Sequence, residues 1–504
     1  MRPGPFRTGA VPGVSSGMAT WTRLTATILA IGAVSALETG AARPNIINIV
    51  LDDQGARDAG WCGSRYYETP AMDRLAGQGV VCTAGYASGA NCMPTRAALM
   101  TGQYAPRTGI YTVGSSARGE DGARRLLPVE NRPHLDGRVV TWAEALQAGG
   151  YATCHIGKWH LGGDAETRPQ AQGFLTSIAG GGNGQPTSYF APWKLPDLPE
   201  GVAGEHLSDA LATAATGWLR QQAGKGPFAL NLWLYAVHSP IQPRADDAAR
   251  FAGRPGPGGT SDAAYAGLLY GADRAVGQVM DELDRLGLAE NTLVVLTSDN
   301  GGLSAASNAP LRGTKGMLYE GGIRVPLAVR WPKRIAAGTT CTQPILSMDL
   351  HATFLAAAGV AQPAGQPCDG IDVLPALAEG RDLGRPAVHW HLPCYLQGGR
   401  KLVDGRRDPQ APFRTTPVGA IRMGSLKLLE YFDDGGLELY DLAADPGEAR
   451  NLAAERAEDA QRLLGEMRRW RAGIGAPVPS QRDPSFREGK SAGAKPPASD
   501  PADP

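Results

Sequence analysis

The sequence predicts an α/β fold: a large central, mostly parallel sheet flanked by helices, with a smaller C-terminal antiparallel α+β subdomain. Short apolar runs typical of buried parallel strands alternate with helical stretches through most of the chain. Polar clusters follow several of these runs directly. After about residue 384, short strands separated by turns replace the alternation, which favours an antiparallel sheet there.

The elements of the main sheet can be placed in chain order. The run Asn-Ile-Ile-Asn-Ile-Val-Leu at 45–51 is apolar enough for a fully buried strand. Gly149 and Gly150 end a helix before the next strand, because glycine readily takes the conformation that closes a helix. We expect strand 45–51, helix 141–148, strand 151–156, strand 228–235, helix 263–286 and strand 292–297.

Composition divides the chain into four segments. We expect a leader at 1–42, a main α/β domain at 43–383, a C-terminal subdomain at 384–476, and a tail at 477–504. The tail is rich in Pro, Ser, Ala and Asp, which predicts disorder. In the subdomain we expect strands at 418–423, 426–431 and 437–441 and a helix at 454–471.

The N-terminus is typical of a secretory signal. Arg23 precedes an apolar run at 24–37, which small residues and Arg43 follow. The run is too short and too rich in Ala, Gly and Ser to predict a stable membrane span. We therefore expect export to the periplasm or the extracellular space, with Met18 as an alternative start. The alternative interpretation is an N-terminal leader that carries no targeting signal.

Bulk composition excludes some classes of function. The 504 residues are 42% hydrophobic and 19% charged, which allows a sizeable core and argues against global disorder. Lys plus Arg and Asp plus Glu both number 49, so no net basic field recruits nucleic acid. The seven cysteines leave one unpaired thiol in an exported protein, and chemistry at Cys92 would account for it. Pairing of the other six stays open, with buried thiols as the alternative.

Polar side chains come directly after four of the predicted strands. They are Asp52 and Asp53, Lys158 and His160, His238, and Asp299 and Asn300. Because open α/β sheets build their sites at the carboxyl edge of the strands, we expect these clusters to converge. Adjacent carboxylates at a buried strand end repel each other, and a hard cation relieves that cost. Carboxylate and amide oxygens favour calcium or magnesium over zinc. Taken singly, each cluster has a plain alternative as a solvated strand end or an Asx turn.

Cys92 lies at the start of a predicted short helix. Pro94 suits the first helical turn and Gly102 suits its end. A helix N-terminus offers unpaired N–H groups and a dipole that favour an anion beside Cys92. For a lone cysteine, a buried thiol before a short helix is the simpler interpretation.

The spacing Cys92-x-Pro94-x-Arg96 resembles the signature of the formylglycine-dependent, type I or arylsulfatase-like sulfatase family. Its continuation here is Leu-Met-Thr-Gly at 99–102. Asn91 and Met93 depart from the commonest form of the signature. The core of the pattern is intact, and the resemblance implies an alkaline-phosphatase-like fold.

Further segments carry the same resemblance in the family's order, from about residue 43 to 453. They are Gly150 to His160, Asp-Asp-Gln-Gly at 52–55, His-Ser-Pro at 238–240, Ser-Asp-Asn-Gly at 298–301, Arg-Gly-Thr-Lys-Gly at 312–316, and Glu-Gly-Gly-Ile-Arg-Val-Pro at 320–326. One motif alone would be weak. Six in order make chance a poor explanation and imply a sulfuric ester hydrolase.

The resemblance implies a mechanism for residue 92. A formylglycine-generating enzyme would oxidise Cys92 to formylglycine, whose hydrate has two geminal hydroxyls. One hydroxyl, activated by the metal and by Asp299 as base, attacks sulfur and expels the alcohol. The second then loses its proton to His160, and sulfate is eliminated. An unmodified Cys or Ser lacks that second hydroxyl and would trap the covalent sulfate.

The resemblance also implies roles for the other residues. His238 and Lys315 would lie near the leaving oxygen, as candidate proton donor and charge stabiliser, and Arg96 and Lys158 would orient the formylglycine. Lys158, His238 and Lys315 would bind the sulfate ester. Calcium, with magnesium as the alternative, would be held by Asp52, Asp53, residue 92, Asp299 and Asn300.

The substrate is expected to be an aryl sulfate or, preferably, a carbohydrate sulfate. The segment His-Trp-His-Leu-Pro-Cys-Tyr at 389–395 combines imidazoles and aromatic rings, which suit a sugar ring. We expect His391 to contact a galactose-type sugar, and a strand packed in a domain interface is the alternative. Two other functions stay open: a phosphodiesterase or phosphonate monoester hydrolase of the same superfamily, and a sulfated-glycan binding protein with unmodified Cys92.

Overall fold

The computed structural model describes residues 42–256, 262–303, 308–397, 401–403, 406–408 and 413–487. The predicted leader, apart from Ala42, and the predicted tail after residue 487 lie outside the described residues. Within the described ranges, no helix combines the length and the apolar character that crossing a membrane requires.

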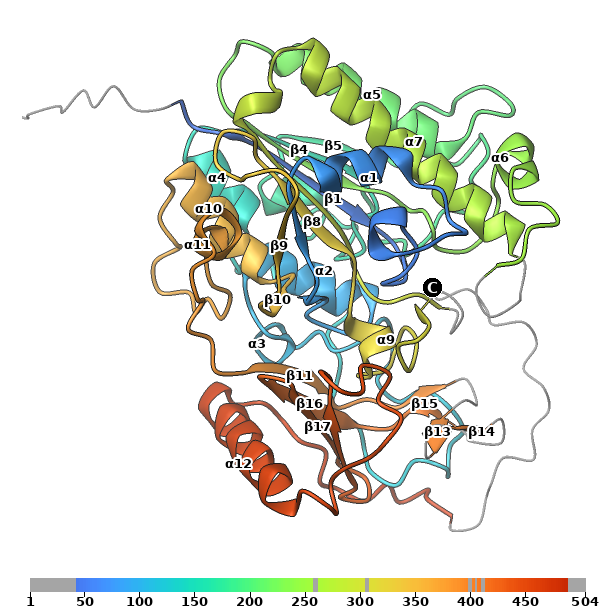
Figure 1. The fold of residues 1–504 in the computed structure, drawn as a ribbon, viewed down its shortest axis with the longest axis vertical. Coiled ribbons are helices and arrows are strands. Elements are labelled where there is room, and N and C mark those ends of the chain that lie inside the picture. The colour runs from blue at the N-terminus through green and yellow to red at the C-terminus, as the bar shows by residue number, and fades with distance from the viewer. Residues whose placement is uncertain are drawn as a thin grey trace, which may run out of the picture. The chain divides into compact units, whose positions relative to one another are not determined.

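The predicted α/β architecture is confirmed. Within the described residues, eight strands form one sheet in the order β5-β4-β6-β1-β7-β8-β2-β9. Figure 1 labels β1, β4, β5, β8 and β9 of this sheet. Strand β8 runs antiparallel to β7 and β2, whereas the other neighbours are parallel. The strands are β1 (Asn45–Leu51), β2 (Val80–Cys82), β4 (Ala152–Gly157), β5 (Thr176–Ile178), β6 (Phe228–Trp233), β7 (Thr292–Ser298), β8 (Leu327–Arg330) and β9 (Thr339–Cys341), with β3 (Gly85–Tyr86) and β10 (Ile345–Leu346) paired separately.

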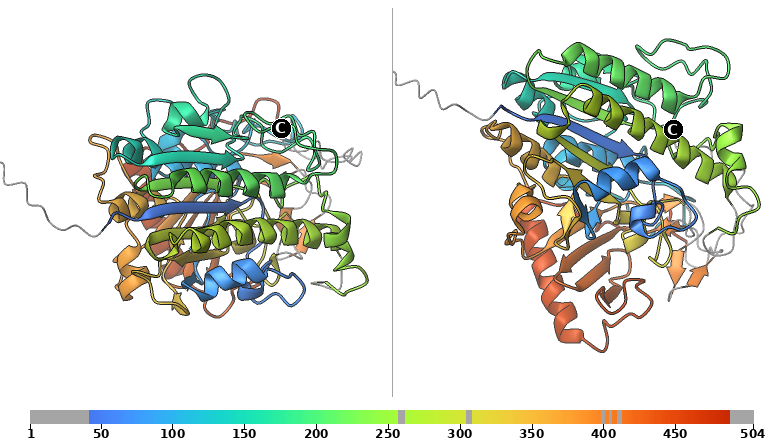
Figure 2. Two further views of the ribbon diagram at one scale, coloured as in Figure 1. Left: turned by 90° about the horizontal axis from the view of Figure 1, so that it is seen from above. Right: turned by 45° about the horizontal axis from the view of Figure 1, so that its top comes forward.

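Helices cover both faces of this sheet (Figure 2). Alternate residues of β1 point to opposite faces, so Ile47 and Ile49 join one core and Ile46 and Val50 the other. The first core includes α1 (Pro70–Gly77), α5 (Leu207–Gln222) and α7 (Ala263–Arg285), and α6 (Ala245–Ala249) packs against α7. The second includes α2 (Cys92–Thr101), α4 (Trp142–Ala148), α10 (Asp349–Ala358) and α11 (Leu374–Glu379). The short helices α3 (Ala105–Thr108) and α9 (Glu320–Ile323) and the 3-10 turns η1 (Gly60–Cys62), η2 (Pro169–Gln172) and η4 (Ala289–Asn291) complete this part.

Local chemistry fixes the predicted helix starts. Thr141 and Glu144 form a capping box before α4: the Glu144 amide donates to the Thr141 hydroxyl at 3.2 Å, and the Thr141 amide donates to the Glu144 carboxylate at 2.8 Å. Asp262 caps α7 by accepting from the Tyr265 amide at 2.9 Å. Each cap satisfies amides that the first helical turn leaves unpaired.

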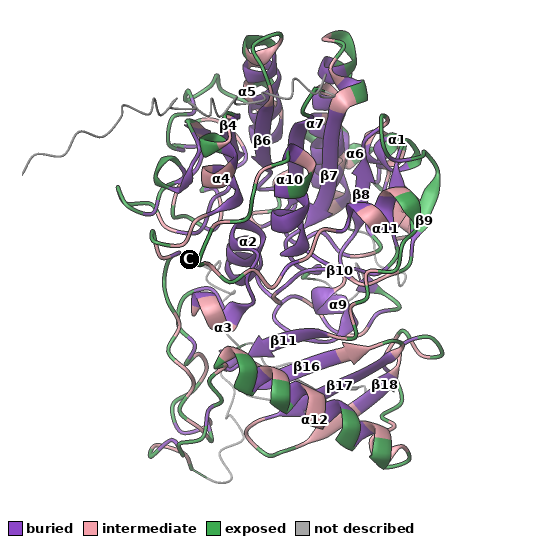
Figure 3. Cartoon of the chain, turned by 90° about the vertical axis from the view of Figure 1, so that its left-hand side faces the viewer, coloured by how far each residue is buried: buried purple, intermediate pink, exposed green. Residues whose placement is uncertain are grey.

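The C-terminal part is antiparallel, as predicted. The sheet order is β11-β16-β17-β18, and α12 packs on one face of it (Figure 3). Its elements are β11 (Val388–Leu392), β12 (Leu396–Gln397), β13 (Lys401–Val403), β14 (Arg406–Asp408), β15 (Phe413–Thr415), β16 (Val418–Met423), β17 (Leu426–Tyr431), β18 (Leu437–Asp441) and α12 (Ala457–Ile474). Helix α12 lies three residues later than predicted, because residues 453–456 form a turn and Gly475 closes the helix at a φ of 67°.

Residues 477–487 depart from the predicted disorder. The Leu127 amide donates to the Gln481 carbonyl at 2.9 Å, and the Asp483 amide donates to the Arg125 carbonyl at the same distance. Asp483 is buried, 3.6 Å from Arg124. The prediction is wrong for these residues because composition does not reveal backbone pairing with a distant segment.

Candidate active site

The predicted polar clusters meet at the carboxyl edge of four neighbouring strands. Strands β4, β6, β1 and β7 adjoin in the sheet, and each leads into one cluster. A Cβ on Gly157 would lie 1.9 Å from the Trp233 carbonyl oxygen, so only glycine permits the close approach that ends β4. Helix α2 starts at the same edge and adds Cys92. The cluster comprises Asp52, Asp53, Cys92, Arg96, Lys158, His238, Asp299, Asn300 and Lys315.

Asp52 lies between an ammonium group and a thiol. Lys158 Nζ donates to Asp52 Oδ2 at 2.6 Å, and Cys92 Sγ donates to Asp52 Oδ1 at 3.6 Å. All three residues are buried. Burial, followed by repulsion from Asp299, raises the pKa of Asp52 to about 8 despite Lys158. Additional positive charge would therefore stabilise the ionised form of Asp52.

Asp53 points its carboxylate at three other groups. Its φ of 61° is a left-handed conformation that non-glycine residues adopt rarely and often at functional sites. Asn300 Nδ2 donates to Asp53 Oδ1 at 2.6 Å, and Lys315 Nζ lies 3.1 Å from the same oxygen. His238 Nε2 lies 3.6 Å from Asp53 Oδ2. Burial raises the pKa of Asp53, but Lys315 and then His238 outweigh it, so the pKa lies below its usual value.

The contacts of His238 define its tautomer. Nδ1 lies 3.0 Å from the Ser239 carbonyl oxygen and donates to it, and Nε2 lies 3.2 Å from Lys315 Nζ. Because a carbonyl can only accept, the ring proton is on Nδ1 and Nε2 accepts from Lys315. Burial, followed by Lys315, lowers the pKa of His238 to about 4. The transferable proton of this pair is therefore on Lys315.

Arg96 joins Asp299 to the loop that carries Lys158. Its Nε and Nη2 donate to Asp299 Oδ2 at 2.9 and 2.7 Å, and its Nη1 donates to the Lys158 carbonyl at 3.0 Å. The guanidinium lies 4.8 Å from the ring centre of Trp233. Burial raises the pKa of Asp299, but Arg96 and then Lys158 reverse this and lower it. Asp299 is held as a carboxylate.

The two departures from the family signature have structural roles. Asn91 Nδ2 donates to Thr112 Oγ1 at 2.9 Å, which ties the start of α2 to a neighbouring segment. Met93 is buried in the core beside the sheet. The thiol of Cys92 is 1% exposed, and burial raises its pKa. An unmodified thiol here is therefore a poor nucleophile.

His160 lies beside a glycine-rich segment. Its φ is 60°, and a Cβ on Gly184 would lie 2.6 Å from His160 Cε1. Burial, followed by Lys158, lowers the pKa of His160 well below its usual value. Its Nδ1 is buried without a hydrogen-bond partner among the described residues. A neutral imidazole with an open nitrogen can accept a proton.

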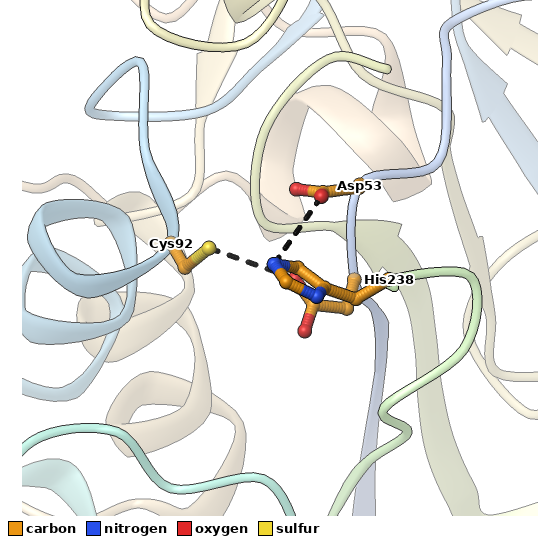
Figure 4. Close-up of side chains that lie close together, drawn as sticks. Asp53, Cys92 and His238 are labelled. Atoms are coloured by element: carbon orange, nitrogen blue, oxygen red, sulfur yellow. Dashed lines mark hydrogen bonds and ion pairs between the residues drawn. The ribbon is translucent and has the colours of Figure 1, made fainter. Parts of the chain in front are cut away.

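The donor set fits a hard cation. Potential ligand atoms of Asp52, Asp53, Cys92 and His238 lie within 4.8 Å of one another, and Figure 4 labels the last three of these residues. Asn300 Oδ1 is buried and has no hydrogen-bond partner in the described part of the chain, a costly state that a bound ion would relieve. His238 Nε2 already accepts from Lys315, so the oxygen atoms are the better ligands.

The structure does not support the predicted sugar contact of His391, which stays a prediction. His391 is 6% exposed in β11, and its Nε2 lies 2.7 Å from the Pro477 carbonyl oxygen. The rings of Tyr111, Phe432 and Trp470 lie around it. These contacts favour the alternative of a packed interface strand, because they bury the imidazole among other rings.

Sequence patterns missed several contributors to the site. Trp233 ends β6 as an apolar residue with no polar signal, yet its ring supports Arg96. Tyr189 donates its hydroxyl to the His238 carbonyl at 2.9 Å. Glu320 and Lys427 form a buried ion pair at 2.9 Å, which only the fold brings together.

The known proteins that are similar to this chain include sulfatases. The sequence model described as "Sulfatase" matches residues 44–360. A "Sulfatase" of Formosa agariphila is 31% identical, covering 86% of this chain and 90% of the relative. An "N-acetylgalactosamine-6-sulfatase" of Canis lupus familiaris is 32% identical over 72% of each chain. The solved structure "Crystal structure of Ps i-CgsB in complex with k-i-k-neocarrahexaose" is 28% identical with a TM-score of 0.70, covering 89% of this chain and 95% of that one.

Fold, site and relatives define a sulfuric ester hydrolase of the alkaline-phosphatase-like type. The chain belongs to the sulfatase family.

Proposed function

We propose that this chain removes sulfate from a carbohydrate sulfate ester, using a formylglycine made from Cys92 and one calcium ion. Asp52, Asp53, Asp299, Asn300 and residue 92 would hold the ion, with magnesium as the alternative. The supporting observation is the buried meeting of Cys92 with Asp52 and Lys158 at the start of α2. Without a bound cation, the three buried carboxylates would repel one another, because little solvent screens their charges.

Formylglycine would supply a hydroxyl nucleophile and the ion would supply positive charge opposite the sulfate oxygens. The chain's own residues then position and transfer protons. Asp299 is kept ionised by Arg96 and can accept a proton at its carboxylate. Lys158 and Lys315 place two positive charges in the water-poor site, where they favour the anionic transition state.

Lys315 would donate the proton that the leaving oxygen needs. In the tautomer inferred from its contacts, His238 Nε2 accepts from Lys315, so the lysine carries the proton and the imidazole fixes its direction. His160, held neutral with Nδ1 open, would take the proton that accompanies sulfate release. This division modifies the sequence-based prediction, in which His238 was the proton donor.

The substrate class is proposed from the relatives' names. One relative is named for a 6-sulfated N-acetylgalactosamine, and a similar structure holds an oligosaccharide. We propose a sulfated sugar of the galactose type. We also propose export with maturation by a formylglycine-generating enzyme, supported by the apolar run at 24–37 and by the odd cysteine count.

The modification of Cys92 can be tested directly. The protein purified from its own host, or from a host with the maturation enzyme, should yield a residue 92 peptide with the mass of formylglycine. Cys92→Ala should abolish turnover of an aryl sulfate and keep the parent circular dichroism spectrum. The matched control Cys62→Ala, at a partly exposed thiol outside the site, should remain active. Active protein whose peptide carries only thiol would exclude the proposal.

Substrate preference needs a separate comparison. Sulfate release should be measured from sulfated galactose and N-acetylgalactosamine, an aryl sulfate, a steryl sulfate and an aryl phosphate diester. We expect the highest kcat/KM on a sugar sulfate. A clear preference for the steryl sulfate would refute the carbohydrate assignment, and preference for the diester would refute sulfate as the natural substrate.

A further inference from the structure

The segment between Arg312 and Arg324, which carries Lys315, contains backbone contacts so close that only glycine fits at them. A Cβ on Gly321 would lie 2.4 Å from the Gly313 carbonyl oxygen, and one on Gly322 would lie 2.6 Å from the Thr314 carbonyl oxygen. A Cβ on Gly301 would lie 2.0 Å from the Gly321 carbonyl oxygen. The start of α9 therefore touches the backbone just before Lys315 and the backbone just after Asn300.

The first residue of α9 is held from the C-terminal part. Lys427 of β17 lies 2.9 Å from Glu320 Oε1 and 2.9 Å from Glu448 Oε1. The Glu320 amide donates to Glu448 Oε2 at 2.7 Å, and Tyr86 donates its hydroxyl to Glu320 Oε2 at the same distance. Glu320, Lys427 and Glu448 are all 0% exposed. Lys427 thus holds the side chain of Glu320. Glu448, which pairs with the same lysine, holds the backbone amide of Glu320.

A second group of contacts holds the other end of the segment. Arg312 Nη1 donates to the Tyr440 hydroxyl at 2.7 Å and to the Glu448 carbonyl at 3.0 Å. The Tyr319 hydroxyl donates to Glu438 Oε2 at 2.7 Å. Tyr440 and Glu438 belong to β18, next to the strand of Lys427. Both ends of the Lys315 segment are therefore attached to one sheet.

A buried triad of charges adds little stability compared with well-packed apolar side chains, because desolvation offsets the Coulomb attraction. What it does provide is a defined geometry, since any shift exposes an unpaired charge. The C-terminal sheet contributes none of the reacting groups proposed above. We propose that Lys427 is a positioning residue for the catalytic site: it fixes Glu320, and through α9 it sets the place of Lys315. This inference rests on the proposed role of Lys315.

The test is a double-mutant cycle on the matured full-length enzyme with an aryl sulfate. Lys427→Met/Glu448→Gln removes one positive and one negative charge. Glu320 is then the one carboxylate of the triad that loses its lysine partner. It is measured alone and on a Lys315→Ala background. Glu430→Gln is the matched control, because Glu430 lies on β17 too but pairs with Arg471 and Arg468 of α12, away from the segment. Each variant is also assayed for its unfolding midpoint and its KM.

We expect the Lys427→Met/Glu448→Gln pair to lower kcat by about ten- to a hundredfold with KM changed less than about threefold, since a displacement near 1 Å suffices for such losses. On the Lys315→Ala background the same pair should lower kcat by less than about threefold. Glu430→Gln should reduce the midpoint but not kcat. If the double variant does not fold, Glu448→Gln alone, which keeps an acceptor for the Glu320 amide, should show a smaller loss with the same dependence on Lys315.

Two results would overturn the inference. Equal losses of kcat with and without Lys315 would show a general structural effect, and an unchanged kcat would show that the triad serves stability only. Failure of the proposed function is distinguishable, because then Lys315→Ala by itself would leave kcat at the parental value.

Discussion

Replacement of Arg96 by lysine keeps the charge but removes the forked geometry of the guanidinium. Arg96 is 0% exposed and makes three hydrogen bonds, two to Asp299 Oδ2 and one to the Lys158 carbonyl. An ammonium on a shorter stem cannot span both partners, so we expect two of the three bonds to be lost. Hydrogen bonds to charged groups contribute roughly 1.5–3 kcal/mol each, and the retained charge offsets part of the loss. The unfolding free energy should fall by about 2–4 kcal/mol.

The assay is urea unfolding followed by tryptophan fluorescence, together with kcat on an aryl sulfate. Because Arg96 orients both Asp299 and Lys158, Arg96→Lys should also lower kcat by about a hundredfold. Arg74→Lys is the matched control: Arg74 pairs with Asp281 at 2.6 Å but is 42% exposed, and such pairs contribute less than about 1 kcal/mol. A midpoint and a kcat for Arg96→Lys equal to those of the parent would refute the proposed role.

Three further predictions concern the metal, the pH dependence and His391. Asp53→Asn should weaken calcium binding in calorimetric titration by at least about tenfold, because it deletes a charge facing the ion; unchanged affinity would place the ion elsewhere. Burial lowers the pKa of His391 to about 4, whereas an unfolded imidazole titrates near 6.5. As the pH falls, the unfolded chain therefore protonates His391 before the folded chain does. The contribution of the neutral imidazole to the free energy of unfolding is present above pH 6.5 and is lost as the pH falls toward 4, by up to about 1.4 kcal/mol per pH unit. His391→Gln should show a shallower fall of the urea midpoint over that range, and an unchanged slope would contradict this. His391→Ala should reduce sugar sulfate and aryl sulfate turnover alike, and a selective loss on the sugar would restore the sugar contact.

Much of the fold follows from local sequence patterns. The apolar runs ending in Asp52 and in Ser298 are confirmed as the adjacent strands β1 and β7, and the strands predicted after residue 417 are β16, β17 and β18. Polar residues immediately after buried strands are a local signal, so the meeting of Asp53, His238 and Asn300 could be expected before their distances were known.

Other features depend on contacts between distant segments and leave no local trace. His391 looked like a sugar ligand because its neighbours in sequence are aromatic, but the Pro477 carbonyl and the ring of Trp470 occupy its surroundings. Lys427 stands in a short, mostly apolar strand, Leu-Lys-Leu-Leu-Glu-Tyr, every residue of which is buried. Its two carboxylate partners come from residues 320 and 448, which no periodicity connects to it.

The burial of helix α2 sets an order of events in time. Every residue of α2 is buried, and its later face is closed by α10, where His351 Nδ1 lies 2.9 Å from the Met100 carbonyl oxygen. Helix α10 begins at Asp349, so α2 stays uncovered until the chain has grown far beyond it; at roughly 5–20 residues per second this takes on the order of tens of seconds. The enzyme proposed to oxidise Cys92 would therefore have to act before α2 is covered, in competition with folding. A variant that folds before Cys92 has been oxidised would accumulate as a stable protein with an unmodified thiol.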